Sequence, residues 1–117
     1  MRKALARVVP VAATLLLATL VESAPAADLT GRYHGTAVVT YDPRRSMNCR
    51  DYTVTAFQVT GRDARFFGFR GTISPRGELV MQSGDQWING RFAGRQFFGQ
   101  LWRRHPACAW NLALTAG

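Results

Sequence analysis

Alternation of apolar and polar residues, interrupted every few positions by turn residues, is the pattern that most constrains this chain after residue 28. No stretch there keeps apolar residues at positions i, i+3, i+4 and i+7 over three helical turns, so helices are not expected. Short alternating segments joined by tight turns are typical of small antiparallel sheets. The sequence therefore predicts an all-β domain, an antiparallel meander of about seven to eight short strands that closes into a barrel or sandwich.

Turn residues delimit the individual strands. The expected strands are 31–41, 51–60, 64–73, 78–83, 86–92, 96–102 and 108–115. In the second of these, the apolar phase slips by one residue between Ala56 and Phe57, which predicts a β-bulge. The segment 74–77, Ser-Pro-Arg-Gly, has proline and glycine where a type I turn favours them, and so predicts a hairpin.

The first 26 residues have the three parts of a secretory signal peptide. Their start is basic, residues 8–21 are apolar apart from two threonines, and small residues flank a cleavage site after Ala26. The apolar run is shorter than the ~20 residues that span a bilayer. We therefore expect residues 1–26 to be cleaved and residues 27–117 to form a single β domain. That domain is expected in the periplasm or secreted, and not spanning a membrane.

Cys49 and Cys108 are the only cysteines of the chain. Both belong to the exported part, where an oxidising compartment favours disulfides, so we expect them to pair. A reactive thiol and an intermolecular bridge are the alternatives. Two cysteines exclude both a dense disulfide scaffold and a Cys₄ zinc site.

Catalytic patterns are absent from the sequence. His34 and His105 are the only histidines, and no His-Glu-x-x-His, Cys-x-x-Cys or Gly-x-Ser-x-Gly spacing occurs. The serines after residue 26 lie at predicted turns, and most carboxylates lie beside a turn or an arginine. We therefore predict a protein that is not an enzyme, with no catalytic residues, no metal site and no cofactor.

Arginine is the unusual component of the composition. After cleavage the net charge is +6, because twelve arginines face six carboxylates and no lysine remains. A disulfide would bring five arginines to one end of the domain: Arg44, Arg45, Arg50, Arg103 and Arg104. The planar guanidinium matches phosphate and carboxylate groups bidentately. These residues are the predicted anion-binding site; the alternative is a GC-rich coding composition with solvated side chains.

Aromatic residues are dense in the expected domain. Six of them are expected in the core, namely Phe57, Phe67, Phe69, Phe98, Trp102 and Trp110. In a barrel with an open end, Tyr33, Trp87 and Trp110 would instead line a ligand pocket. Seven or so short strands leave little interior once side chains fill it, which favours a core.

Several glycine-containing motifs carry a resemblance to known proteins. The segments 71–73 with 77–79, 90–94, 98–102 and 108–110 follow one another as in a family of small exported bacterial β proteins with no assigned activity. The chain resembles that family, which implies a signal peptide, a compact β fold and one disulfide. Residues 29–33, Leu-Thr-Gly-Arg-Tyr, also resemble the opening strand of lipocalin-like and avidin-like barrels. Small periplasmic protease inhibitors share that lipocalin-like plan.

The function expected from these features is a non-catalytic binding module of the cell envelope. Its partner would be an acidic envelope component or an acidic protein, held through the arginine-rich loops. Nucleic acid is not expected, because export separates the chain from it and no recognised binding motif occurs. A lipocalin-like protease inhibitor and a small-ligand-binding barrel are the alternatives.

Overall fold

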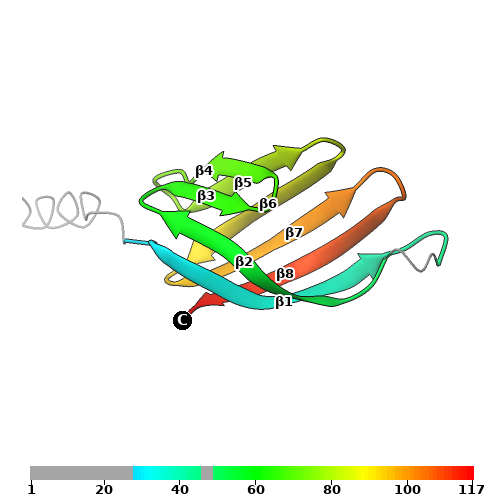
Figure 1. The fold of residues 1–117 in the computed structure, drawn as a ribbon, viewed down its shortest axis with the longest axis horizontal. Helices are drawn as coiled ribbons and strands as arrows, with labels where there is room; N and C mark the ends of the chain where they lie inside the picture. Colours follow the sequence, from blue (N-terminus) through cyan, green and yellow to red (C-terminus); the bar gives the residue numbers. More distant parts are fainter. Residues whose placement is uncertain (1–27, 46–48) are drawn as a thin grey trace, which may run out of the picture.

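A computed structural model of the chain describes residues 28–45 and 49–117, and within them every regular element is a strand. The eight strands are β1 (Gly31–Tyr41), β2 (Tyr52–Thr60), β3 (Asp63–Phe66), β4 (Phe69–Thr72), β5 (Glu78–Ser83), β6 (Gln86–Ala93), β7 (Gln96–Arg103) and β8 (Cys108–Ala116). They form one antiparallel sheet in the order β4-β3-β2-β1-β8-β7-β6-β5. The sheet curls into a nearly closed barrel (Figure 1), which confirms the predicted fold class. The predicted signal peptide, residues 1–26, lies outside the described residues.

The barrel closes where the two ends of the sheet, β4 and β5, approach each other. At Gly71 on β4, an added Cβ would lie 2.9 Å from the carbonyl oxygen of Val80 and 3.0 Å from Leu79 Cδ1. Only glycine fits such a close backbone approach. The predicted turn after β4 is present, with the Gly77 amide donating to the Ser74 carbonyl at 2.9 Å. Near-closure also leaves little exposed sheet edge for pairing with another chain.

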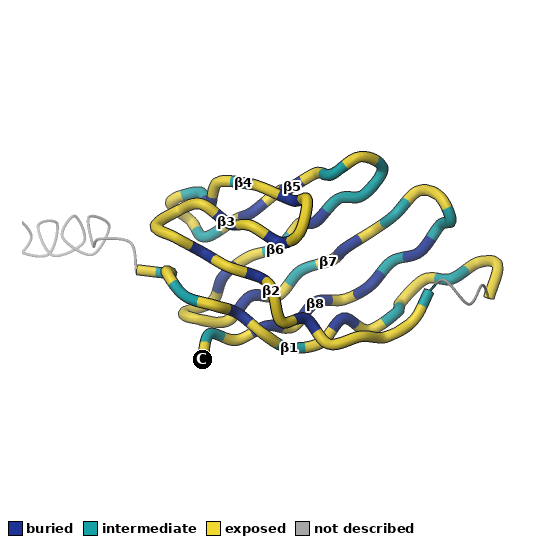
Figure 2. Tube along the Cα trace, viewed as in Figure 1, coloured by how far each residue is buried: buried dark blue, intermediate teal, exposed yellow. Residues whose placement is uncertain are grey.

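All eight strands contribute buried apolar residues to the core. Figure 2 shows these buried positions distributed along the strands among exposed ones. At the centre of the core the ring of Tyr33 packs edge-on against Phe57 and Phe92, with centroids 6.1 and 5.3 Å apart. The Tyr33 hydroxyl donates to the Leu29 carbonyl at 2.8 Å, so its polar atom has a partner. Phe57, Phe69 and Trp110 are buried, as predicted.

The predicted bulge in the second strand is confirmed. Tyr33 pairs with Phe57 and Gly35 with Val54, so two steps along β1 match three along β2. Val54 and Phe57 both point inward, and the two residues between them are exposed. A second irregularity, which the pattern did not predict, lies between Val39 and Tyr41 opposite β8.

The prediction of a single strand over 64–73 with Phe67 in the core is wrong. The segment is a hairpin, β3 and β4, whose turn contains Phe67 with a positive φ of 51° and 80% exposure. Phe66 and Phe69 become cross-strand partners, and their rings stack inside the barrel at 6.2 Å. Because the turn itself, residues 66–69, consists of three phenylalanines and a glycine, alternation alone does not reveal the reversal.

The predicted inward phase of β7 is also wrong. Phe98 and Trp102 are 51% and 49% exposed, whereas Phe97 and Leu101 are buried. The reason lies in the pairing of Gly90 with Gly99 across β6 and β7. An added Cβ on Gly99 would lie 2.9 Å from Phe97 Cε2, so the Phe97 ring occupies the space that the glycines leave inside the barrel.

Candidate functional site

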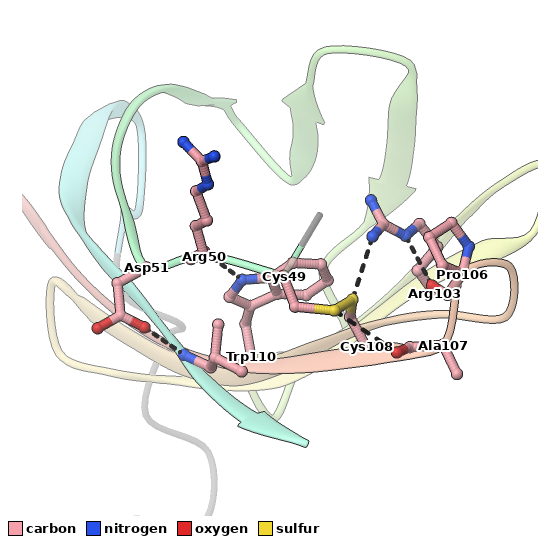
Figure 3. Close-up of a disulfide and its surroundings, with 9 residues drawn as sticks. Cys49, Arg50, Asp51, Arg103, Pro106, Ala107, Cys108 and Trp110 are labelled. Atoms are coloured by element: carbon pink, nitrogen blue, oxygen red, sulfur yellow. Dashed lines mark hydrogen bonds between the residues drawn. A yellow bond between two sulfur atoms is a disulfide. The ribbon is translucent and has the colours of Figure 1, made fainter. Parts of the chain in front are cut away.

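A disulfide joins Cys49 to Cys108 at one end of the barrel, with their Cα atoms 5.9 Å apart (Figure 3). This confirms the predicted pairing. The Cys49 sulfur also lies 3.6 Å from the Ala107 carbonyl oxygen, which places the segment before β2 against the loop between β7 and β8. We call this the disulfide end; it carries the connections from β1 to β2 and from β7 to β8.

Two hydrogen bonds fix the short segment that follows Cys49. The Trp110 indole donates to the Arg50 carbonyl at 2.7 Å, and the Asp51 carboxylate accepts from the Val39 amide at 2.7 Å. The backbone of this segment is therefore held on β8 and β1 together. Arg50 is exposed, and its side chain points away from the disulfide (Figure 3).

Arg103 is built into the disulfide end. Its Nε donates to the Pro106 carbonyl at 2.9 Å, its Nη2 donates to the Cys108 sulfur at 3.1 Å, and its guanidinium lies 5.3 Å from the Trp110 ring centre. Cation–π contacts of this kind favour an ordered guanidinium. Arg103 therefore positions the loop between β7 and β8, in contrast to the exposed Arg104.

Tyr52, which is 38% exposed, is the first residue of β2 and follows the disulfide end in the chain. Its ring meets Trp110 edge-on, with centroids 6.1 Å apart. Burial raises the pKa of the Tyr52 hydroxyl, and the charge of Arg103 opposes that rise. At neutral pH the hydroxyl is therefore protonated and available as a donor.

The other predicted anion-binding residues are exposed on loops of the same end. Arg44 and Arg45 lie in the turn after β1, and Arg104 lies in the loop after β7. The connections from β1 to β2 and from β7 to β8 lie at the same end of the barrel (Figure 1). Within residues 28–45 and 49–117, no carboxylate forms an ion pair with any of these three arginines. An ion pair elsewhere in that part of the chain joins Arg91 to Glu78 at 3.1 Å, both on the outer face of the sheet. The disulfide thus brings the two arginine-bearing loops to one end, as predicted; their role in binding stays a prediction.

An open groove of about 720 Å³ lies beside the disulfide end, on the outside of the barrel. Tyr41, Trp87, Asn89, Gln100, Trp102 and Arg104 contribute to its lining. Trp87 and Asn89 face outward because Ile88 between them is buried, and Gln100 and Trp102 because Leu101 is buried. We call it the outer-face groove.

Side chains in the outer-face groove form two adjacent rows across the strands. In the first row, Trp87 pairs with Trp102, Trp102 with Ala109, and Ala109 with Tyr41. In the second, Asn89 pairs with Gln100, and Gln100 with Asn111 just beyond the groove. An aromatic row thus runs beside an amide row.

Arg104 closes one side of this groove. Its guanidinium lies 5.1 Å from the Trp87 ring centre, and Trp87 lies 6.2 Å from Trp102. The Arg104 amide donates to the Asp85 carbonyl at 3.0 Å, and the His105 amide to the Asp85 carboxylate at 3.2 Å. These bonds hold the loop between β7 and β8 against the turn between β5 and β6.

The predicted pocket residues are divided between core and groove. Tyr33 and Trp110 are buried in the core, whereas Trp87 lines the outer-face groove. Sequence analysis missed Tyr41, Trp102 and the two amides. The sequence does contain a signal for these residues, because Trp87 lies two positions from Asn89 and Trp102 lies two positions from Gln100. Recognising that each pair faces outward requires knowing which face of the strand is buried.

Within residues 28–45 and 49–117, no three or more histidine, cysteine or acidic side chains gather where a metal ion could be held. No helix in that part of the chain has the length and apolar character to cross a membrane. Comparison with known proteins finds no matching family model, no matching curated protein and no matching solved structure, so the candidate site is interpreted from its own residues.

Proposed function

We propose that this protein is a non-catalytic, exported binding module that takes an acidic envelope component at the disulfide end. The observation that supports this proposal is the display of Arg44, Arg45 and Arg104 on loops of one end. All three are exposed and have no carboxylate partner among the described residues. Because like charges repel, a bound anion that lies near these exposed guanidinium groups is favoured.

The ligand chemistry follows from the guanidinium groups. Each presents a planar fork of donors that fits two oxygens of a phosphate or carboxylate. A single exposed contact of this kind contributes little, roughly 1 kcal/mol or less, so binding requires several at once. A polyanion that spans both loops meets this requirement better than a small ion. Arg103 donates hydrogen bonds within its own loop, so its role in the proposal is to hold that loop in place. Arg50 lies at the same end of the barrel and is exposed.

A matched pair of triple variants tests the proposal. Arg44→Gln/Arg45→Gln/Arg104→Gln removes the exposed charges of the disulfide end. Arg65→Gln/Arg70→Gln/Arg76→Gln removes three exposed arginines elsewhere and gives the same net charge. Polyphosphate and a lipopolysaccharide fragment are titrated against both variants and the wild type at physiological ionic strength.

We expect the wild type and the second triple variant to bind with the same affinity. The first triple variant should bind at least about tenfold more weakly. Equal weakening of both triple variants would mean that only net charge attracts the anion. Equal binding by all three proteins would mean that these arginines do not contribute. Either result would refute the proposed site. Binding of an acidic protein but of neither probe would replace the envelope component with a protein partner.

The alternatives have less support. Aromatic and aliphatic side chains pack together in the described interior, so no observation favours a small ligand held inside the barrel. The protease-inhibitor alternative stays a prediction.

A further inference from the structure

We propose that the outer-face groove binds a saccharide chain that carries acidic groups. The inference extends the proposed function by naming a ligand class, and its acidic part rests on that function. It is carried by the juxtaposition of three features: an aromatic row, an amide row, and an arginine stacked at one side.

The aromatic row suits the apolar faces of sugar rings. Trp102 and Tyr41 are about half exposed, at 49% and 56%, and the small Ala109 lies between them in register. Two strand spacings separate β7 from β1, about 10 Å, which is comparable to the span of a disaccharide. The C–H groups of a pyranose ring pack against an aromatic face, and these two rings flank a low floor on which such a unit fits.

The amide row suits the hydroxyl groups at the rim of a sugar. Asn89 and Gln100 both line the groove, and each amide offers two N–H donors and a carbonyl acceptor. A hydroxyl group donates and accepts, so it pairs with either end of an amide. A purely apolar occupant, such as a lipid tail, would cover these amides without giving them partners, which costs free energy.

The charge of the groove selects an acidic saccharide. Arg103 and Arg104 are the charged residues of its lining, and no carboxylate belongs to that lining among the described residues. The nearby Asp85 carboxylate already accepts the His105 amide. A uronate or phosphate group on the chain would therefore meet the Arg104 guanidinium with no acidic neighbour opposing it within the groove.

Two oligosaccharides that differ only in charge test the inference. Oligogalacturonate carries carboxylates, and its fully methyl-esterified form is the same chain without them; polyphosphate is an anion without sugar rings. Binding is followed by the indole N–H signals of the three tryptophans in ¹H–¹⁵N spectra. Trp110 is an internal reference, because its indole donates to the Arg50 carbonyl inside the molecule.

We expect oligogalacturonate to shift the Trp87 and Trp102 signals and to leave the Trp110 signal in place. The methyl ester should bind at least about fivefold more weakly than the free acid. Trp102→Ala should weaken oligogalacturonate binding about tenfold and leave polyphosphate binding within about twofold. Phe98→Ala, which removes another half-exposed aromatic from the outer face of β7, should change neither.

Other outcomes overturn the inference in distinguishable ways. Polyphosphate binding at the disulfide end, without shifts of Trp87 or Trp102 by oligogalacturonate, would refute the saccharide and leave the proposed function standing. Equal binding of acid and ester would refute the acidic requirement. Equal losses in Trp102→Ala and Phe98→Ala would show that the groove is not the site. Failure of every probe to bind the wild type would refute both proposals.

Discussion

Removal of the disulfide should cost this domain a large share of its stability. Cys49 and Cys108 are 59 positions apart, so the bond closes a loop of most of the β domain. In the chain-entropy model a loop of that length restricts the unfolded chain by about 4 kcal/mol at 25 °C. A domain of this size has a total unfolding free energy on the order of 5–13 kcal/mol. The substitution Cys49→Ala/Cys108→Ala should therefore remove a third or more of it.

Urea denaturation of three species separates the cross-link from the packing of the sulfur atoms. Cys108 is 1% exposed and packs in the core, so its replacement by alanine also removes apolar contacts. Reduced wild-type protein keeps both sulfurs and loses only the bond. We expect it to unfold about 4 kcal/mol more easily than the oxidised protein, and the double alanine variant to lie about 1 kcal/mol below it.

The denaturant slope gives a second, independent readout. A cross-link keeps the unfolded chain compact, so breaking it exposes more surface on unfolding and should raise the m-value. A loss below about 1 kcal/mol on reduction would refute the entropic reasoning. So would a full loss with an unchanged m-value, since it would place the effect of the bond in the folded state.

Three further changes test other parts of the fold. Gly71→Val should lower the unfolding free energy by about 1–3 kcal/mol in urea, because β4 meets β5 there without space for a side chain; an unchanged midpoint would contradict that closure. Arg103→Ala should lower the thermal midpoint, whereas Arg104→Ala should change stability by less than about 0.5 kcal/mol; equal effects would contradict the division of roles. Burial raises the pKa of Tyr52, so its contribution to stability is complete below the unfolded value of about 10 and is lost as pH rises through the folded pKa. The unfolding free energy, measured with urea at pH 8 and pH 11, should therefore fall less in Tyr52→Phe than in the wild type. An equal fall in both proteins would show that Tyr52 is not the cause.

Local signals in the sequence predicted much of the fold. Alternation and turn residues predicted the antiparallel meander, and proline and glycine at fixed turn positions predicted the hairpin at 74–77. The bulge followed from a phase slip between Ala56 and Phe57, which the register between β1 and β2 confirms. The disulfide followed from a compartment argument and needed no knowledge of the fold.

The errors arose where both faces of a strand are apolar. In Phe66-Phe67-Gly68-Phe69, a continuous strand and a tight hairpin give the same hydrophobic pattern, and the choice depends on a turn residue, Phe67, with positive φ. Alternation shows only where a residue differs in hydrophobicity from its neighbours. It carries no information where the neighbours are alike.

The outer-face groove depends on the same ambiguity in β7. Phe97 and Phe98 are equally good core residues, so the sequence leaves the phase of this strand open. The pairing of Gly90 with Gly99 decides it, because the space above two glycines on the inner face receives the Phe97 ring. Trp102 then points outward beside Trp87, and a residue expected in the core becomes part of the candidate site. Two glycines without side chains of their own therefore determine which aromatic residues this protein offers to a ligand.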